Sequence, residues 1–178
     1  GRELRYRFFR DCSGEGGKIA TAHTLSDSME TVLLNLTRGT GIKGLRGIPP
    51  VRGNIVRPLI GCTRREVEDY CRQRGLSFVV DPTNLTSQYS RGRIRNQVIP
   101  QLLELNPGLP AAMARLMARM EDQLALTREL AAAARKDLDR DGLLDREGLL
   151  ALPPPVREEL LLDLLMAEGQ KQSARLLE

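Results

Sequence analysis

The chain has 178 residues, a formal net charge of +4 and a hydrophobic content of 41%, which together predict a globular protein. Aromatic residues make up only 3%, which argues against a protein that binds single-stranded nucleic acid by stacking alone. No apolar run approaches the roughly 20 residues of a membrane-spanning helix, and residues 1–11 lack the apolar core of a signal peptide. We therefore expect a cytoplasmic protein with no membrane contact. These features do not define its oligomeric state.

Positive charge is concentrated in the middle of the chain. Residues 38–100 hold twelve Arg or Lys against four Asp or Glu, so the rest of the chain has a net charge of −4. An excess this large, carried mainly by arginine, favours a phosphate-bearing partner, either a nucleotide or RNA. The three cysteines are far apart and there is one histidine, so we expect neither a metal centre built on thiolates nor a disulfide framework.

Helix and strand patterns alternate over residues 1–81. The expected elements are helices at 2–12, 26–38 and 65–75 and strands at 18–22, 54–60 and 76–80. This alternation predicts an α/β fold with a parallel sheet, in which ligands bind at the carboxyl ends of the strands. His23, Arg57 and Asp81 all lie at such ends.

Local signals support these elements. The helix at 26–38 has an apolar stripe formed by Met29, Val32, Leu33 and Leu36, and Gly39 ends it. Thr63 and Glu66 form a capping-box pair at the start of the next helix. Pro58 indicates an edge strand or the end of a strand.

The pattern becomes wholly helical beyond Arg91. We expect a helix at 94–106, a long helix at about 109–140 and two short helices around a proline break within 146–169. A domain boundary near residue 100 is therefore predicted, with an α/β domain at 1–100 and a helical subdomain at 101–178.

The only histidine, His23, stands at the end of an expected strand, and Asp27 and Glu30 lie at the start of the helix that follows. One interpretation is structural: Thr24 and Asp27 form a capping box, and both acids favour the positive end of the helix dipole. The other is functional: the three side chains surround one crevice suited to phosphate, magnesium and proton transfer. Capping explains the acids but not the histidine, and spacing alone leaves both interpretations open.

Two glycine-rich stretches match phosphate-binding motifs only superficially. Residues 39–44, GTGIKG, follow a helix, whereas the dinucleotide fingerprint lies between a strand and a helix. Residues 13–18, SGEGGK, lack two required Walker A positions, and we expect a turn there. The stretch 38–47 is expected to be a flexible basic loop, either solvated or in contact with a ligand through Arg38, Lys43 and Arg46.

Arg91 and Arg95 are four residues apart in an expected helix and therefore share one face. Two guanidinium groups near a strand-end crevice can hold phosphates or a developing negative charge. A solvated basic helix is the alternative. Before this helix, Asp81 opens a turn that Asn84 completes.

Taken in order, four blocks of the sequence resemble the tRNA(Ile)-lysidine synthetases of the N-type ATP pyrophosphatase superfamily. The blocks are IATAH…D..ET.LL.L.RG.G..GL.G, RPLI, REVEDYCRQRGLSFVVDPTN and Y.R..IR..VIP.L...NP. The resemblance covers roughly residues 1–135, and four ordered blocks are far more specific than any one of them. It implies a Rossmann-like nucleotide-binding domain with a parallel sheet, followed by an all-helical subdomain.

The resemblance also implies a reaction that uses ATP and Mg²⁺. Such enzymes adenylate the C2 carbonyl oxygen of the wobble cytidine in an isoleucine tRNA with a CAU anticodon. The ε-amine of free lysine then displaces AMP, and the product base, lysidine, pairs with A instead of G. ATP, magnesium, isoleucine tRNA and lysine are therefore the implied cofactors and substrates.

Positions that match the family's motifs carry implied roles. His23 orients or stabilises the activated cytidine, and Asp27, next to Glu30, helps to position lysine or a metal ion. Arg91 and Arg95 hold phosphate or tRNA. The remaining matches are Arg38, Gly39 and Arg57, which are expected to bind the nucleotide, and Asp81 and Asn84, which are expected to bind the substrate. Lys43 and Arg46 of the basic loop are also expected to contact the substrate.

The sequence departs from the family pattern in two respects. Where the family usually has a second histidine, an aspartate and a glutamine, as AHHxDDQ, this chain has Thr24, Ser26 and Ser28, and Gly92 stands where asparagine is common. In addition, the sequence contains no S-G-G-x-D-S motif, which grips the pyrophosphate of ATP in this superfamily. We therefore expect that this chain alone neither hydrolyses ATP nor transfers AMP.

Two other functions stay open on the sequence. A tRNA 2-thiocytidine synthetase shares the nucleotide-binding fold, but such proteins usually carry paired cysteines, and this sequence has none. In a different class, the changes at Thr24, Ser26 and Ser28 suit a non-catalytic tRNA-binding module. RNA binding without nucleotide binding would favour the module.

Overall fold

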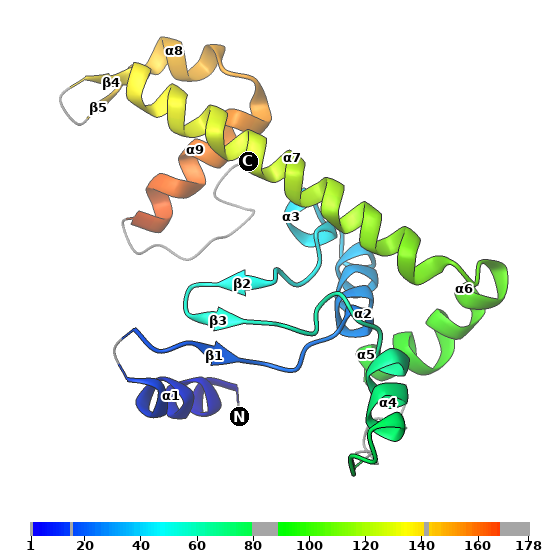
Figure 1. The fold of residues 1–178 in the computed structure, drawn as a ribbon. Helices are drawn as coiled ribbons and strands as arrows, with labels where there is room; N and C mark the ends of the chain where they lie inside the picture. The colour runs from blue at the N-terminus through cyan, green and yellow to red at the C-terminus, as the bar shows by residue number, and fades with distance from the viewer. Residues whose placement is uncertain (1, 15, 80–88, 141–142, 168–178) are drawn as a thin grey trace. The chain divides into compact units, whose positions relative to one another are not determined.

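A computed structural model of the chain describes residues 2–14, 16–79, 89–140 and 143–167 (Figure 1). The chain divides into two compact units, Gly1–Met120 and Glu121–Glu178, and the division falls within helix α7 (Leu109–Leu138). None of the described helices is long and apolar enough to cross a membrane. The domains expected at 1–100 and 101–178 stay a prediction.

The first unit contains a small mixed sheet (Figure 1). Its central strand, β3 (Ile55–Val56), pairs in parallel with β1 (Ile19–Ala20) and antiparallel with β2 (Val51–Arg52). Because β1 and β3 run parallel, the residues that follow them emerge at the same edge of the sheet. The sheet therefore brings residues 21–23 and Arg57 to one edge, as their positions at strand ends predicted.

The prediction of a parallel α/β sheet is confirmed only in part. The parallel pair lies within the expected strands, but the sheet is mixed, and β2 was not expected. The strand expected at 76–80 is wrong for residues 76–79, which form no strand. Valine and phenylalanine favour a strand only where neighbouring strands and a buried face receive them. Here Val79 is 94% exposed, and Phe78 lies beneath the guanidinium of Arg72, whose Cζ is 5.9 Å from the ring centroid.

Helix α2 (Leu25–Leu36) carries the core of the first unit. Thr24 begins the helix with a complete capping box: its hydroxyl accepts from the Asp27 N–H, and the Asp27 carboxylate accepts from the Thr24 N–H. The predicted apolar stripe is confirmed at Met29 and Val32, which are buried against Met117 of α7, but not at Leu36, which is 58% exposed. This face fixes the rotation of α2 and with it the direction of its polar residues.

The stretch 38–47 contains a short helix, α3 (Ile42–Leu45), so the expectation of a flexible loop is wrong. Gly47, which follows α3, has a φ of 72°, a conformation that favours glycine. An added Cβ at Gly47 would also collide with Ser28 Oγ and Met117 Sδ, so the segment packs closely on the core. As predicted, residues 39–44 follow a helix.

The other helices of the first unit largely match the sequence pattern. Thr63 and Glu66 form the predicted capping box, with each side chain bonded to the other's backbone N–H. The helix at 94–106 is present but includes a π turn, in which the Ile99 N–H donates to the Ile94 carbonyl. Pro100 has no N–H to donate to the carbonyl four residues earlier, which accounts for the wider turn. The bounds are α1 (Arg2–Ser13), α4 (Arg64–Gln73), α5 (Ser90–Arg93), the π-helical η2 (Ile94–Val98) and α6 (Ile99–Leu105).

The second unit comprises the end of α7, α8 (Arg146–Ala151), α9 (Pro154–Ala167) and a two-stranded hairpin. The expectation of a wholly helical region is wrong here, because β4 (Asp139–Arg140) pairs antiparallel with β5 (Leu143–Leu144). An Asp-Gly dipeptide, a common hairpin signal, stands between these strands in the sequence. The buried core of the unit consists of Ala131, Val156 and Leu160.

We predict that Met29→Ala destabilises the protein by about 2–5 kcal/mol, because it removes a buried side chain and leaves a cavity beside Val32. Leu36→Ala on the exposed side of the same helix is the control, with an expected change within about 0.5 kcal/mol. Urea unfolding followed by circular dichroism measures both. Equal losses in the two variants would contradict this assignment of the core.

Candidate functional site

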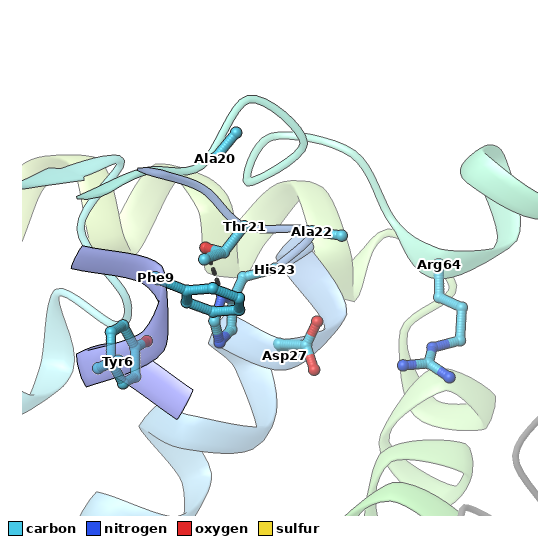
Figure 2. A pocket seen from close by; sticks show the side chains of 8 residues that line it. All are labelled: Tyr6, Phe9, Ala20, Thr21, Ala22, His23, Asp27 and Arg64. Carbon is cyan, nitrogen blue, oxygen red and sulfur yellow. Dashed lines mark hydrogen bonds between the residues drawn. The ribbon is translucent and has the colours of Figure 1, made fainter. Parts of the chain in front are cut away.

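A pocket of about 410 Å³ opens at the sheet edge where β1 ends (Figure 2). It contains two of the predicted site residues, His23 and Asp27. Three further residues, Tyr6, Phe9 and Arg64, were not predicted. The full lining is Tyr6, Phe9, Ala20, Thr21, Ala22, His23, Asp27 and Arg64.

The missed residues differ in the signal that they leave in the sequence. Tyr6 and Phe9 are three residues apart on α1, so they share a helix face, and their rings meet edge to face with centroids 6.1 Å apart. In a chain with few aromatics that pair is a usable signal. Arg64 leaves none, because its place depends on a contact between segments far apart in the sequence.

That contact joins the first turns of α2 and α4. The Arg64 N–H donates to Ser26 Oγ at 3.0 Å, and the Leu25 N–H donates to the Cys62 carbonyl at 2.7 Å. The two helices therefore begin side by side. Asp27, one residue after Ser26, and Arg64 consequently border the same pocket.

The His23 ring is oriented from the strand end. Its Nδ1 lies 2.9 Å from Thr21 Oγ1, and the direction of this hydrogen bond depends on the histidine tautomer. Thr21 in turn is anchored to β3, because its N–H donates to the Val56 carbonyl at 2.9 Å. The imidazole is therefore held by the sheet itself.

Asp27 serves both as a capping residue and as the acid of the pocket. Its Oδ2 accepts from the Thr24 N–H at 2.9 Å and from the Thr24 hydroxyl at 2.8 Å. Its Oδ1 has longer ion-pair contacts, 3.7 Å to Arg91 Nη2 and 3.9 Å to Arg95 Nη2. Burial raises the pKa of Asp27, but the two Thr24 hydrogen bonds and the charges of Arg91 and Arg64 outweigh it and lower the pKa below 3.8.

Glu30 has a different environment one turn later. Its side chain is only 2% exposed, and both carboxylate oxygens are occupied by the predicted arginine pair. Arg91 Nε donates to Oε2 at 2.8 Å, Arg95 Nε to Oε1 at 2.5 Å and Arg95 Nη2 to Oε2 at 2.9 Å. The prediction that Arg91 and Arg95 share a face is confirmed, and that face meets Glu30.

Three of the positions that depart from the family pattern make hydrogen bonds that hold the fold. Thr24 caps α2, and Ser26 joins α2 to α4. Ser28 Oγ accepts from the Ile48 N–H at 2.9 Å and lies 3.2 Å from Met117 Sδ in the core. These hydroxyl groups therefore stabilise the backbone that surrounds the site.

Arg57 lies at the predicted sheet edge but does not line the pocket. Its guanidinium is buried, and Nη1 donates to the Pro49 carbonyl at 2.6 Å. Among the described residues, its Nε has no hydrogen-bond partner. The proposed nucleotide contact at Arg57 stays a prediction.

The remaining predicted residues are placed elsewhere or are not described. Arg38 and Gly39 follow the last turn of α2, whereas Asp27 lies in its first turn. The helix between them is about 18 Å long. Lys43 lies within α3 and Arg46 ends it, and neither residue lines the pocket. Asp81 and Asn84 lie outside the described residues. The structure therefore places His23 in one pocket with Asp27, which contacts the paired arginines, whereas Arg38 and Gly39 lie outside this pocket.

The described residues include no cluster of three or more histidine, cysteine or acidic side chains that would hold a metal ion. Of the four acidic oxygens on α2 at the site, only Asp27 Oδ1 lacks a short hydrogen bond, and two guanidinium groups lie near it. Such surroundings do not form a protein cage for Mg²⁺. Asp27 as a metal ligand stays a prediction.

Comparison with known proteins supplies a family. A protein-family model described as a PP-loop domain matches residues 1–102. That range includes the sheet, the pocket and the helices that bear Glu30 and the paired arginines. More than half of the chain is covered by this match.

Curated relatives named tRNA(Ile)-lysidine synthase resemble the chain. The protein of Bacteroides thetaiotaomicron is 38% identical over 156 residues, which are 86% of this chain and 37% of that protein. That of Geobacillus kaustophilus is 36% identical over 175 residues, 93% of this chain and 38% of the relative. That of Caldanaerobacter subterraneus is 49% identical over 107 residues, 59% and 23% respectively. The chain thus spans between 23% and 38% of the length of these relatives.

We predict that Glu30→Ala destabilises the protein by about 3 kcal/mol, the lower end for breaking a buried ion pair. The cost is limited because Arg91 and Arg95, at 46% and 22% exposed, regain water contact. Glu68→Ala, which breaks the exposed pair with Arg72, is the control and should cost less than about 1 kcal/mol. Denaturant unfolding distinguishes them. Equal costs would show that the Glu30 cluster is not structural.

The lowered pKa of Asp27 predicts a pH dependence of stability. Above its unfolded pKa, near 3.9, the carboxylate is charged in both states and the folded state gains from it. As pH falls, the unfolded state binds the proton first, and the gain is lost by the time pH passes below the folded pKa.

The stability difference between wild type and Asp27→Asn should therefore be larger at about pH 7 than at about pH 3. Urea unfolding at a series of pH values measures it. A difference that stays constant with pH would show that the Asp27 charge does not stabilise the fold.

Proposed function

The chain belongs to the PP-loop domain family, and on this premise we propose that the gene product carrying it functions as a tRNA(Ile)-lysidine synthase. The observation that supports this most is the likeness to such synthases over up to 93% of the chain. The pocket formed by His23, Asp27 and Arg64, backed by the clamp of two arginines on Glu30, adds a chemical reason. It offers a histidine, an acid and cations within one small region.

In the proposed reaction, the C2 oxygen of the wobble cytidine displaces pyrophosphate from ATP, and an adenylated base forms. The lysine ε-amine then forms a bond to C2, and the C2 oxygen leaves with AMP. His23, fixed by Thr21, suits the orientation of the base. Arg91, the more exposed arginine of the pair, suits contact with the leaving phosphate.

Charge distribution supports RNA binding by the first unit. Residues 1–120 contain 19 Lys or Arg and 10 Asp or Glu, whereas residues 121–178 contain 8 and 13. A polyanionic partner such as isoleucine tRNA is attracted to the basic unit and repelled by the acidic one. We propose that residues 1–120 provide the main tRNA contacts within this chain.

ATP and Mg²⁺ are part of the proposal. Mg²⁺ commonly takes one or two protein carboxylates and completes its octahedral shell with phosphate oxygens and water. In this chain Asp27 is the residue assigned to it by resemblance, and ATP and water would have to supply most of the ligands. When bound, the ion would offset charge on the phosphates.

The two alternative functions are less well supported. The described cysteines, Cys12, Cys62 and Cys71, are free thiols, and no two of them form a pair of the kind used in sulfur transfer. A non-catalytic module was favoured by the changes at Thr24, Ser26 and Ser28. These residues now have structural roles, so their identity no longer argues against catalysis.

The proposal is tested on the gene product that carries this chain. With ATP, radiolabelled lysine and isoleucine tRNA bearing a CAU anticodon, we expect label to enter the tRNA with release of AMP and pyrophosphate. The same tRNA with uridine at the wobble position is the control and should stay unlabelled. RNA binding with no incorporation of lysine would instead identify a binding module.

A further inference from the structure

Arg64 lines the pocket, and the fold does not use its guanidinium group. Its backbone N–H is bonded to Ser26, but within the described part of the chain its guanidinium makes no hydrogen bond or ion pair. The nearby Arg91 and Arg95 are both bonded to Glu30. Arg64 therefore has donors for a planar anion, which a guanidinium can bind through two parallel hydrogen bonds.

The position of Arg64 relative to Asp27 is fixed by the backbone. Arg64 is the first residue of α4, after the capping residue Thr63. Its bond to Ser26 attaches it to the residue before Asp27. In Figure 2 the Asp27 carboxylate and the Arg64 guanidinium face each other across the pocket. They form no hydrogen bond or ion pair with each other among the described residues, and both line the same pocket of about 410 Å³.

The charges select the class of ligand. Asp27 Oδ2 is occupied by Thr24, whereas Oδ1 has only ion-pair contacts of 3.7 Å and longer. An amino acid's main chain places an ammonium beside a carboxylate and matches Asp27 and Arg64 together. A phosphate would satisfy Arg64 but would offer no donor cation to the pocket side of Asp27. Phe9, Ala20 and Ala22 offer apolar surface for the methylene groups of a lysine side chain.

Resting on the proposed function, we infer that Arg64 binds the α-carboxylate of free lysine while Asp27 Oδ1 accepts from its α-ammonium. This arrangement holds both main-chain groups of the substrate and leaves the ε-amine as the nucleophile. Arg64 thereby selects an amino acid over a simple diamine. His23 lines the same pocket, beside the path of the extended side chain.

The test compares lysine with cadaverine, which keeps both amines but lacks the carboxylate. The gene product that carries this chain is studied as wild type, Arg64→Ala and Arg65→Ala, with calorimetry for lysine, cadaverine and ATP. Arg64→Ala should weaken lysine binding about 10 to 100 fold, the effect of losing a hydrogen bond to a charged group. Cadaverine and ATP binding should not change. Arg65, exposed beside Asp69, is the matched control and should have no effect.

Three results would overturn the inference: no lysine binding by the wild type, weaker ATP binding with normal lysine binding in Arg64→Ala, or equal losses for lysine and cadaverine. The second result would assign Arg64 to phosphate, and the third to folding. Failure of the proposed function is distinguishable. In that case lysine binding would depend on Arg64, but no lysine would enter the tRNA.

Discussion

The site depends on one buried carboxylate held by two arginines. Glu30 projects from α2, and Arg91 and Arg95 reach it from α5 and η2, more than 60 residues later. A carboxylate at 2% exposure is shielded from bulk water, so its charge depends on the hydrogen bonds that the two guanidinium groups donate. This cluster fixes the rotation of α2 on its polar side, as Met29 and Val32 do on its apolar side.

The same cluster gives two acids on one helix different tasks. Glu30 has both oxygens in short charged hydrogen bonds and is closed to a substrate. Asp27, one turn earlier, uses one oxygen to cap the helix and keeps the other on the pocket side. The structural and functional interpretations of this helix start are therefore compatible, because capping fixes the carboxylate that faces the pocket.

Features set by neighbours in sequence were predictable. The capping boxes at Thr24 and Thr63, the stripe through Met29 and the shared face of Arg91 and Arg95 all follow from helix geometry, and the structure contains each. Features set by distant partners were not. Helical spacing predicts that Arg91 and Arg95 point the same way, but it does not say that Glu30 receives them.

The errors have the same origin. Residues 76–79 have the composition of a strand, yet strand formation depends on a partner that composition does not reveal. The π turn before Pro100 follows from a local rule, but a proline can equally end a helix, so the sequence did not distinguish the outcomes. Arg64 entered the site only through the bond between its backbone and Ser26.

That bond also changes the meaning of the residues that depart from the family pattern. An aspartate or glutamine at these positions would add polar groups to the site, whereas Ser26 and Ser28 turn their hydroxyls to backbone N–H groups of Arg64 and Ile48. Asp27 faces Arg64 across the pocket. Asp27 is therefore the acid that lines the pocket, with Arg64 across from it and with Arg91 and Arg95 at 3.7 and 3.9 Å from its Oδ1, so the ion pairs behind Asp27 and the open donors of Arg64 lie on different sides of one carboxylate.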